Sequence, residues 1–434
     1  MRLRCQPNGN LIGKVVEKSG IVWYNRFMRA VNLLDKSELI ETNKLKRIQN
    51  VPFSMNMKRL CDKMSLTWLN NGFICQELYA PFKINKDIEY RTDLEKKYDI
   101  VMKQAKKVNA DDESLKIIET FGAKILNSLD LYYKADIAES NNIILELVKE
   151  IGDNSFAVNS ILNSDAFPGV KSNELQFFRS RLGPPNKTFT AKDMLHLPSS
   201  LRSKSGNYRF SIPGNPSMYL ANSSYGCWIE TGCPAEIDFN VSPILLEGNQ
   251  RIFNLAISIR DFRCLNEFEK ERVHCWLKLY ILTIATNYVI KEENRTFKSE
   301  YIISQSLMMA CKKMGYDGIA YYSRRVDNET FALCAINLAL FVDYDGEYSG
   351  MIKHIKIDDA FNYFLYKQLN NSLKYKDYEL RSIYTGYITN IGSYERQYPY
   401  RETDFYNFDK FLFSTWRDKP NGKGKDKIPW GIEI

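Results

Sequence analysis

Several features that mark common classes of protein are missing from this 434-residue sequence. No stretch reaches the ~18 uninterrupted apolar residues that a bilayer-spanning helix needs. Even the most apolar segment, residues 277–290, is interrupted by polar side chains at Lys278, Thr283, Thr286 and Asn287. The first residues also carry no apolar core of signal-peptide length, so we expect a cytoplasmic protein with no membrane association.

Spacings typical of metal and disulfide sites are also absent. The nine cysteines include no Cys-x-x-Cys pair, and their odd number and wide scatter favour reduced thiols. Only three histidines are present, at positions 196, 274 and 354, and none lies within four residues of another, so we expect no metal site. The sequence also lacks the Gly-x-Gly-x-x-Gly pattern of redox dinucleotide cofactors.

Positive charge is present but concentrated at one end of the chain. The 60 Lys and Arg residues exceed the 52 Asp and Glu residues, which gives a net charge of +8. Residues 1–60 hold twelve basic and four acidic residues, so the rest of the chain is neutral overall. A basic segment attracts phosphate-rich partners such as nucleic acid, but interspersed basic residues equally fit solvated helix faces. The sequence leaves both interpretations open.

The first region, residues 1–167, is expected to be mainly helical. Apolar residues recur at helical spacing over residues 111–129, and acidic residues stand at the start of this segment. A second helix is expected from a cap at Ser140 to a stop at Gly152. Neither helix carries an acid, base or phosphate motif, so we expect this region to regulate the protein or to form oligomers rather than to line an active site.

Turn residues replace the helical pattern near residue 167, so we place a domain boundary at about 168. Residues 168–346 alternate strand-like and helix-like segments, which predicts an α+β core. The expected strands are 218–221 and 335–342, and the expected helices are 267–290 and 301–313. Residues 347–434 form an aromatic-rich extension that we expect to pack on this core and to end in a mobile tail.

Polar residues cluster beside the strand-like runs of the middle region, in residues 177–183, 206–230 and 315–323. Together these segments supply arginines, tyrosines, a glutamate and a serine. Guanidinium groups suit pyrophosphate oxygens, an aromatic ring stacks on nicotinamide, and a carboxylate stabilises an oxocarbenium ion. This set of residues suits cleavage of the N-glycosidic bond of a dinucleotide, without a metal or a nucleophilic triad.

The same segments resemble the RES-domain toxins, a family named for an Arg, a Glu and a Ser. The resemblance covers about 170 residues and rests on Phe177-Phe178-Arg179, Tyr208-Arg209-Phe210, Pro213-Gly-Asn-Pro216, Tyr219 with Glu230 eleven residues later, Asp317-Gly-Ile319, Tyr321-Tyr-Ser323 and Asn337-Leu-Ala-Leu-Phe341. The chain departs from compact members of the family in having about 165 preceding residues and a long stretch between Glu230 and Ser323. It also has Phe178 where Tyr is commoner and Phe210 where Trp is commoner.

The resemblance implies a fold similar to that of ADP-ribosyltransferases and an activity that consumes NAD as a substrate, with no cofactor. Such toxins deplete NAD by hydrolysis or phosphorolysis, or transfer ADP-ribose, and act in a toxin–antitoxin or phage-defence setting under the restraint of an antitoxin. It implies catalytic roles for Glu230, Ser323 and Tyr219. The implied NAD-binding residues are Arg179, Arg181, Arg209, Tyr219 and Tyr321. Arg179 and Arg181 lie two residues apart on one side of a strand, so the sequence does not separate them.

Three functions remain open at this point. The first is an enzyme that cleaves NAD with water or phosphate as acceptor. The second is a transferase that attaches ADP-ribose to a protein or nucleic acid, which the basic residues 1–60 would favour. The third is a non-catalytic binding module. The partner, the activating trigger and the oligomeric state are left open, with an antitoxin, a trigger protein and a second copy of the chain as candidates.

Overall fold

The computed structural model describes residues 76–78, 80–84, 88–152, 174–247, 250–257, 270–290, 295–326, 335–343, 355–369, 387–388 and 398–418. The chain divides into two compact units, Met1–Lys63 and Met64–Ile434, and all the described residues belong to the second. The basic residues 1–60, the boundary expected near residue 168 and the tail expected after residue 418 lie outside the described residues.

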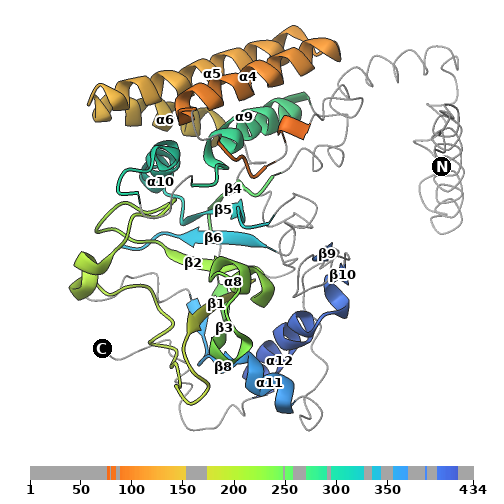
Figure 1. The fold of residues 1–434 in the computed structure, drawn as a ribbon. Coiled ribbons are helices and arrows are strands. Elements are labelled where there is room, and N and C mark those ends of the chain that lie inside the picture. The colour runs from red at the N-terminus through yellow and green to blue at the C-terminus, as the bar shows by residue number, and fades with distance from the viewer. Residues whose placement is uncertain are drawn as a thin grey trace, which may run out of the picture. The chain divides into compact units, whose positions relative to one another are not determined.

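A mixed sheet of eight strands forms the centre of the described structure (Figure 1). The strands lie in the order β4-β5-β6-β2-β1-β3-β7, and β8 also pairs with β3. Only β4 and β5 run parallel within this sheet, and the other neighbours are antiparallel. The strands are β1 Glu174–Leu182, β2 Met218–Ala221, β3 Phe239–Glu247, β4 Ile252–Leu255, β5 Gly318–Tyr322, β6 Ile336–Leu340, β7 Ile355–Ile357 and β8 Phe361–Asn362. A separate ribbon pairs β9 Tyr387–Ile388 with β10 Tyr398–Pro399.

Helices cover both faces of the sheet, so the described chain is an α+β protein, as the sequence predicts. On one side lie α9 Lys270–Thr286 and α10 Ile302–Lys313, which are covered in turn by α4 Tyr90–Lys107, α5 Asp112–Tyr133 and α6 Ile137–Gly152. On the other side lie α8 Ser224–Glu230, α11 Tyr363–Leu369 and α12 Asp404–Asp418. The short 3-10 turns are η2 Gln76–Leu78, η3 Ser199–Lys204, η4 Glu236–Asp238, η6 Ser299–Tyr301 and η9 Tyr400–Glu402. No helix among the described residues is both long enough and apolar enough to cross a bilayer.

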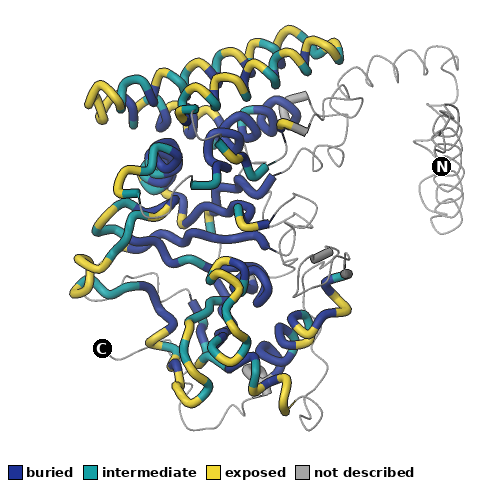
Figure 2. The backbone as a smooth tube through the Cα atoms, in the orientation of Figure 1, coloured by how far each residue is buried: buried dark blue, intermediate teal, exposed yellow. Residues whose placement is uncertain are grey.

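Two hydrophobic cores lie on opposite faces of the sheet. Alternate residues of β5 show the division, because Ile319 and Tyr321 join the core with α9 and α10, whereas Ala320 and Tyr322 join the core with α11 and α12. Figure 2 shows the strands and α9 as mostly buried, while exposed residues recur along α4 and α5. The cores explain why strand-like runs of this sequence are apolar at almost every position.

The first helices share the core of α9 and α10. The hydroxyl of Tyr90 donates to the carbonyl of Ala285 at 2.6 Å, and that of Tyr98 donates to the carbonyl of Ile281 at 3.2 Å. Apolar residues of α4, α5 and α6 belong to the same buried cluster as those of α9 and α10. The helices before residue 152 therefore pack directly on helices that follow the sheet's first strands.

The expected helix over residues 111–129 is confirmed as α5, and Asp111 caps it by accepting a hydrogen bond from the Ser114 N–H at 3.0 Å. The expectation that Ser140 caps the next helix is wrong. Helix α6 begins at Ile137, and the Asp136 carboxylate accepts from the Glu139 N–H at 3.2 Å. Ser140 is buried within the helix, 3.0 Å from the Ser128 hydroxyl. The sequence alone therefore did not distinguish a serine buried between two helices from a serine that caps a helix.

The expected strands and helices of the middle region are confirmed with small shifts of their ends. Residues 218–221 form β2, and residues 335–342 contain β6. Residues 267–290 contain α9, and residues 301–313 contain α10. The sequence did not predict α8, a short helix of seven residues that ends at Glu230.

Candidate functional site

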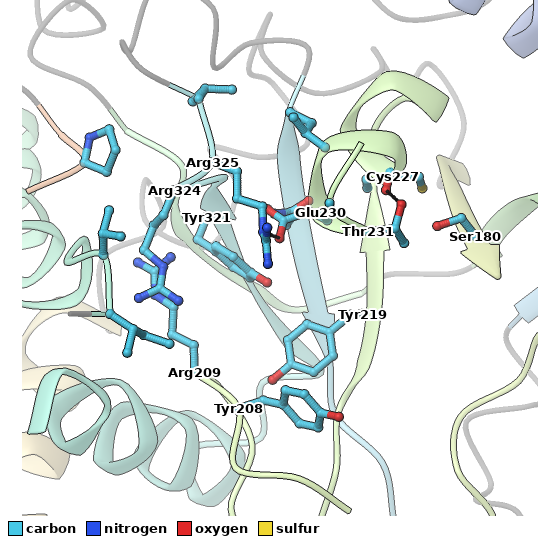
Figure 3. Close-up of a pocket in the computed structure, with 18 of the residues that line it drawn as sticks. Ser180, Tyr208, Arg209, Tyr219, Cys227, Glu230, Thr231, Tyr321, Arg324 and Arg325 are labelled. Carbon is cyan, nitrogen blue, oxygen red and sulfur yellow. Dashed lines mark hydrogen bonds and ion pairs between the residues drawn. The ribbon is translucent and has the colours of Figure 1, made fainter. Parts of the chain in front are cut away.

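A pocket of about 740 Å³ lies where strands β1, β2, β5 and β6 meet the end of α8 and the segment after α9 (Figure 3). These strands and the end of α8 all contribute polar or charged side chains to its lining, and the segment after α9 contributes Val289 and Ile290. The lining includes five residues to which the sequence analysis assigned a role, namely Arg179, Arg209, Tyr219, Glu230 and Tyr321. Residues that lie more than 140 positions apart in the chain therefore meet in one cavity.

Strand register brings three of the lining side chains to one face of the sheet. Strand β6 lies between β5 and β2, and its Asn337 is paired with Tyr321 on one side and with Ala221 on the other. Side chains alternate along a strand, so Tyr219, two residues before Ala221, faces the same side as Asn337. All three side chains line the pocket.

Glu230 is held by hydrogen bonds at the end of α8. Its Oε1 accepts from the Ser323 hydroxyl at 2.5 Å and from the Asn337 amide at 2.6 Å. The Ser323 hydroxyl in turn accepts from the Arg325 N–H at 3.1 Å. The other carboxylate oxygen, Oε2, lies 3.8 Å from Arg325 Nε, and 37% of the side chain is exposed. One oxygen is therefore fixed by two hydrogen bonds, and the other lies beside the guanidinium group of Arg325.

Two arginines of the pocket have donors without a partner among the described residues. The Nη2 of Arg209 donates to the Asn287 side chain at 2.9 Å, but its buried Nε and Nη1 make no hydrogen bond. The Nη1 of Arg179 donates to the Tyr219 carbonyl at 3.1 Å, and its buried Nε is likewise unpaired. Unpaired buried donors carry a large desolvation cost, so both groups suit an incoming anion.

Burial lowers the pKa of both arginines. It lowers the pKa of Arg209 to about 9, helped by the charge of Arg324. Burial and the charge of Arg181 lower the pKa of Arg179 to about 10. Both guanidinium groups remain charged at neutral pH, and an anion bound beside either of them would raise its pKa again.

Aromatic rings surround the arginines. The Arg209 guanidinium lies 4.8 Å from the ring centroids of both Phe210 and Tyr321. The Tyr219 hydroxyl lies 2.7 Å from the Ser211 hydroxyl and accepts from the Phe210 N–H at 3.3 Å. Burial raises the pKa of Tyr219, so its hydroxyl stays neutral and braces the loop that carries Arg209.

Several lining residues were not predicted from the sequence. Arg324 donates to the Tyr288 carbonyl and, at 3.1 Å, to the Tyr301 hydroxyl. Arg325 stands beside Glu230, and Tyr208, which is half exposed, lies at 5.9 Å from the Tyr219 ring. In the sequence, Arg324 and Arg325 could have been noticed as site residues because they directly follow Ser323. Asn337 stood in a motif of the resemblance but received no role there.

Two predicted residues lie outside the pocket wall. Ser323 is buried and reaches the site through its hydrogen bond to Glu230 rather than as a wall residue. Arg181, two residues beyond Arg179 on β1, does not line the pocket. It lies near Asp193, whose pKa it helps to lower. The structure thus separates the two arginines that the sequence left equivalent.

The remaining reactive side chains near the site are poor nucleophiles or lie elsewhere. Cys227 lines the pocket, but burial raises the pKa of its thiol, so no thiolate forms at neutral pH. Neither His196 nor His274 lines the pocket, and His354 lies outside the described residues. All four described cysteines, Cys227 among them, are free thiols.

Among the described residues, one group of side chains is close enough to hold a metal ion, and it lies away from the pocket. Ligand atoms of Asp111, Glu113 and His274 lie within 4.8 Å of one another. The two ring nitrogens of His274 face different carboxylates, Nε2 at 3.7 Å from Asp111 and Nδ1 at 3.3 Å from Glu113. A single ion meets only one ring nitrogen, so this geometry suits a histidine that bridges two carboxylates.

Comparison with known proteins finds a curated relative for part of the chain. No family model matches the sequence. The chain is similar to a Bacillus subtilis (strain 168) protein named "Putative toxin YopC", with 28% identity over 261 residues that cover 54% of each chain. The chain thus spans about half the length of this curated relative. A chain of the M. tuberculosis MbcT–MbcA toxin–antitoxin complex matches 46% of this chain and 90% of its own length at 13% identity, but the TM-score of 0.24 is too low to carry an argument.

Proposed function

We propose that this protein is a toxin-like enzyme that cleaves the N-glycosidic bond between nicotinamide and ribose in NAD. The observation that carries the proposal is the Glu230 carboxylate, fixed by Ser323 and Asn337 within a pocket whose arginines have unpaired donors. The sequence similarity to a protein named as a toxin supports the same assignment. The proposal includes an ADP-ribosyltransferase-like core, a cytoplasmic location, no cofactor, and restraint by an antitoxin.

The arginines bind the diphosphate of NAD in this proposal. Arg209 offers two unpaired donors, and the planar guanidinium forms paired hydrogen bonds with phosphate oxygens. Arg179 offers a third donor from β1, on the same pocket. The exposed ring of Tyr208 and the ring of Tyr219 provide aromatic surface for a base.

Glu230 stabilises the charge that develops as the bond breaks. The C1′–N bond breaks with its electron pair, which leaves with nicotinamide as a neutral molecule, and the ribose becomes an oxocarbenium ion. Oε2 of Glu230, which lies beside Arg325 on a side chain that lines the pocket, faces this cation in the proposal, while Ser323 and Asn337 keep Oε1 in place. Water then adds to C1′ and loses a proton to give ADP-ribose. With phosphate as acceptor, a phosphate oxygen bonds to this same carbon, which is C1″ in the numbering of ADP-ribose, and the product is ADP-ribose 1″-phosphate.

A second candidate is the transfer of ADP-ribose to a macromolecule. The observation in its favour is the exposure of the Glu230 side chain, 37% of which is open to solvent. An acceptor larger than water can therefore approach the carboxylate from outside. The chemistry up to the oxocarbenium ion is the same, so the two candidates differ only in the acceptor.

The test uses NAD labelled on the nicotinamide and, separately, on the adenine. We expect the full-length protein to release nicotinamide and to leave the adenine label in a small molecule. Adenine label attached to protein or nucleic acid would instead identify the transferase. If both labels remain in intact NAD, while Glu230→Gln and wild type behave alike, the protein is a binding module and the proposal is wrong. Glu119→Gln, an exposed change on α5, is the matched control.

A further inference from the structure

The pocket has one wall that comes from the first region of the chain. Pro81 and Lys83 line it, although every other lining residue follows position 178. The segment is fixed by two backbone hydrogen bonds, from the Phe82 N–H to the Asn287 carbonyl and from the Val289 N–H to the Phe82 carbonyl, both at 2.9 Å. These bonds form a parallel bridge between Phe82 and Tyr288, next to the end of α9.

The side chain of Phe82 anchors this wall. Phe82 is 4% exposed and belongs to the core cluster with α9, and its ring lies 5.3 Å from that of Tyr288. Side chains alternate along extended backbone, so burial of Phe82 directs its neighbours Pro81 and Lys83 to the opposite side, which is the pocket. The Lys83 side chain is exposed there and forms no ion pair with any described residue.

Lys83 belongs to the arginine side of the pocket. Arg209 donates to Asn287 and Arg324 donates to the Tyr288 carbonyl, so both arginines rest on the short segment that pairs with Phe82. Figure 3 shows Arg209 and Arg324 together on one side of Tyr321, and Glu230 on the other. Lys83, Arg209 and Arg324 therefore lie at one end of the pocket. Among the described residues, no carboxylate lines this end.

We propose that Lys83 is a substrate-binding residue that contacts the phosphate groups of the dinucleotide from the rim of the pocket. This inference rests on the proposed function, and it identifies which charges complete the diphosphate site. An ammonium group on a flexible stem at the rim adapts to a phosphate oxygen that the buried guanidinium groups leave uncovered. The first region then completes the substrate site, which differs from the expectation that it stands apart from the active site.

The experiment measures binding of ADP-ribose, which keeps the diphosphate and lacks nicotinamide, to the full-length protein. We expect Lys83→Ala to weaken binding about threefold to fivefold, the usual worth of one partly exposed charge contact, and to raise the KM for NAD by a similar factor with kcat unchanged. Lys83→Arg keeps the charge and should restore binding. The effect of Lys83→Ala should shrink as salt rises, because a rim contact is screened. Lys96→Ala, which removes the same charge from an exposed face of α4, is the matched control.

The outcomes separate this inference from the proposed function. If wild type cleaves NAD and Lys83→Ala binds ADP-ribose as tightly as wild type, only the role of Lys83 is wrong. If ADP-ribose binding depends on Lys83 but wild type releases no nicotinamide, the proposed reaction is wrong and the phosphate-binding role of Lys83 stands. Equal weakening by Lys83→Ala and Lys96→Ala would assign the effect to net charge and overturn the inference. Absence of any ADP-ribose binding to wild type overturns the diphosphate site and the role of Lys83, whereas the nicotinamide assay alone decides the proposed reaction.

Discussion

The pocket has a carboxylate end around Glu230 and an arginine end, and the two ends differ in how many of their polar atoms form hydrogen bonds. At the carboxylate end, Oε1 of Glu230 accepts two hydrogen bonds, and Ser323 is itself held by the Arg325 backbone. At the arginine end, which holds Arg209 and Arg324, two buried donors of Arg209 lack partners among the described residues. A carboxylate that stabilises a transition state is most effective when the protein already holds it in position. Unpaired buried donors instead favour ligand binding, because a bound ligand supplies the hydrogen bonds that they lack. The difference suggests chemistry at one end and substrate binding at the other.

The two ends also depend on different parts of the chain. The arginine end rests on residues 287–290, which are braced by backbone hydrogen bonds to Phe82 and by the hydrogen bond that the Tyr288 hydroxyl donates to Asp93 of α4. The carboxylate end rests on α8, β5 and β6, and α8 packs on α12. Changes to the first region should therefore affect binding, and changes to α8 or its supports should affect catalysis.

The largest expected effect follows from removing the first region. A fragment of residues 168–434 lacks α4, α5 and α6, so the apolar surface of α9 and α10 that they cover would be exposed to water. We expect this fragment to lose its cooperative thermal unfolding and its nicotinamide release. A fragment of residues 64–434, which corresponds to one compact unit, is the control and should keep both. Increased activity of a folded 168–434 fragment would instead support the regulatory role expected from the sequence.

Glu230→Gln should produce the largest effect of a single substitution. The amide oxygen still accepts from Ser323 and Asn337, but the charge opposite the oxocarbenium ion is lost. One such contact is commonly worth ~3 kcal/mol, so we expect kcat for nicotinamide release to fall roughly a hundredfold with little change in KM. Thermal unfolding should match wild type, since the side chain is partly exposed. A normal kcat in the folded variant would exclude Glu230 from the chemistry.

Arg209→Met should weaken binding without weakening the fold. Loss of a charge-assisted contact with a phosphate typically costs ~2 kcal/mol, so we expect ADP-ribose to bind about thirtyfold more weakly. The folded state should not lose stability, because the substitution also removes a buried charge with two unpaired donors. Binding by titration calorimetry and unfolding by denaturant test the two parts separately. Arg181→Ala, outside the pocket on β1, should bind normally, and equal weakening there would contradict the division between the two ends.

Ser323→Ala should have a moderate effect on catalysis. It removes one of two hydrogen bonds to Oε1 of Glu230, which is worth ~1 kcal/mol, so we expect kcat to fall about fivefold. Asn337 still holds the carboxylate, so Asn337→Ala in the Ser323→Ala background should cost more than the sum of the two single changes. Strict additivity of the two losses would show that the residues do not act together on Glu230.

The sequence predicted the local features of the fold and most of the pocket, but not its assembly. The spacing of apolar residues over 111–129 is sufficient for a helix, and the run that holds Tyr219 is recognisable as a strand, whereas the strand β5 that holds Tyr321 was expected to be a turn. The role of Asn337 depends on its register with Tyr321 across β5 and β6, which no local pattern specifies. The position of Lys83 depends on the bridge between its neighbour Phe82 and Tyr288, about 200 residues later. Contacts of this range leave no periodicity in a single sequence, so only the folded chain shows them.

The smallest expected effect concerns a second carboxylate that supports α8 from its other end. Asp409 of α12 is fully buried and accepts from the Ser224 N–H at 3.0 Å and from the Tyr400 hydroxyl at 2.5 Å. Burial raises its pKa to about 7, although both hydrogen bonds oppose the shift. Glu230 occupies the last position of the same helix, so α8 links a supporting carboxylate to the one that faces the pocket.

The raised pKa of Asp409 predicts how stability depends on pH. The folded state keeps a proton on Asp409 up to about pH 7, whereas the unfolded chain releases it near pH 4, so the folded state binds more protons between these values. This group therefore contributes stability that is fully present below pH 4, falls as the pH rises and is lost above about pH 7. Asp409→Asn keeps an acceptor for Ser224 and cannot ionise. Between pH 6 and pH 8 the wild type should lose about 1 kcal/mol of unfolding free energy relative to this variant. Parallel pH profiles of the two proteins, measured by urea unfolding, would show that Asp409 has an ordinary pKa in the folded state, and Asp404→Asn at the exposed start of α12 serves as the control.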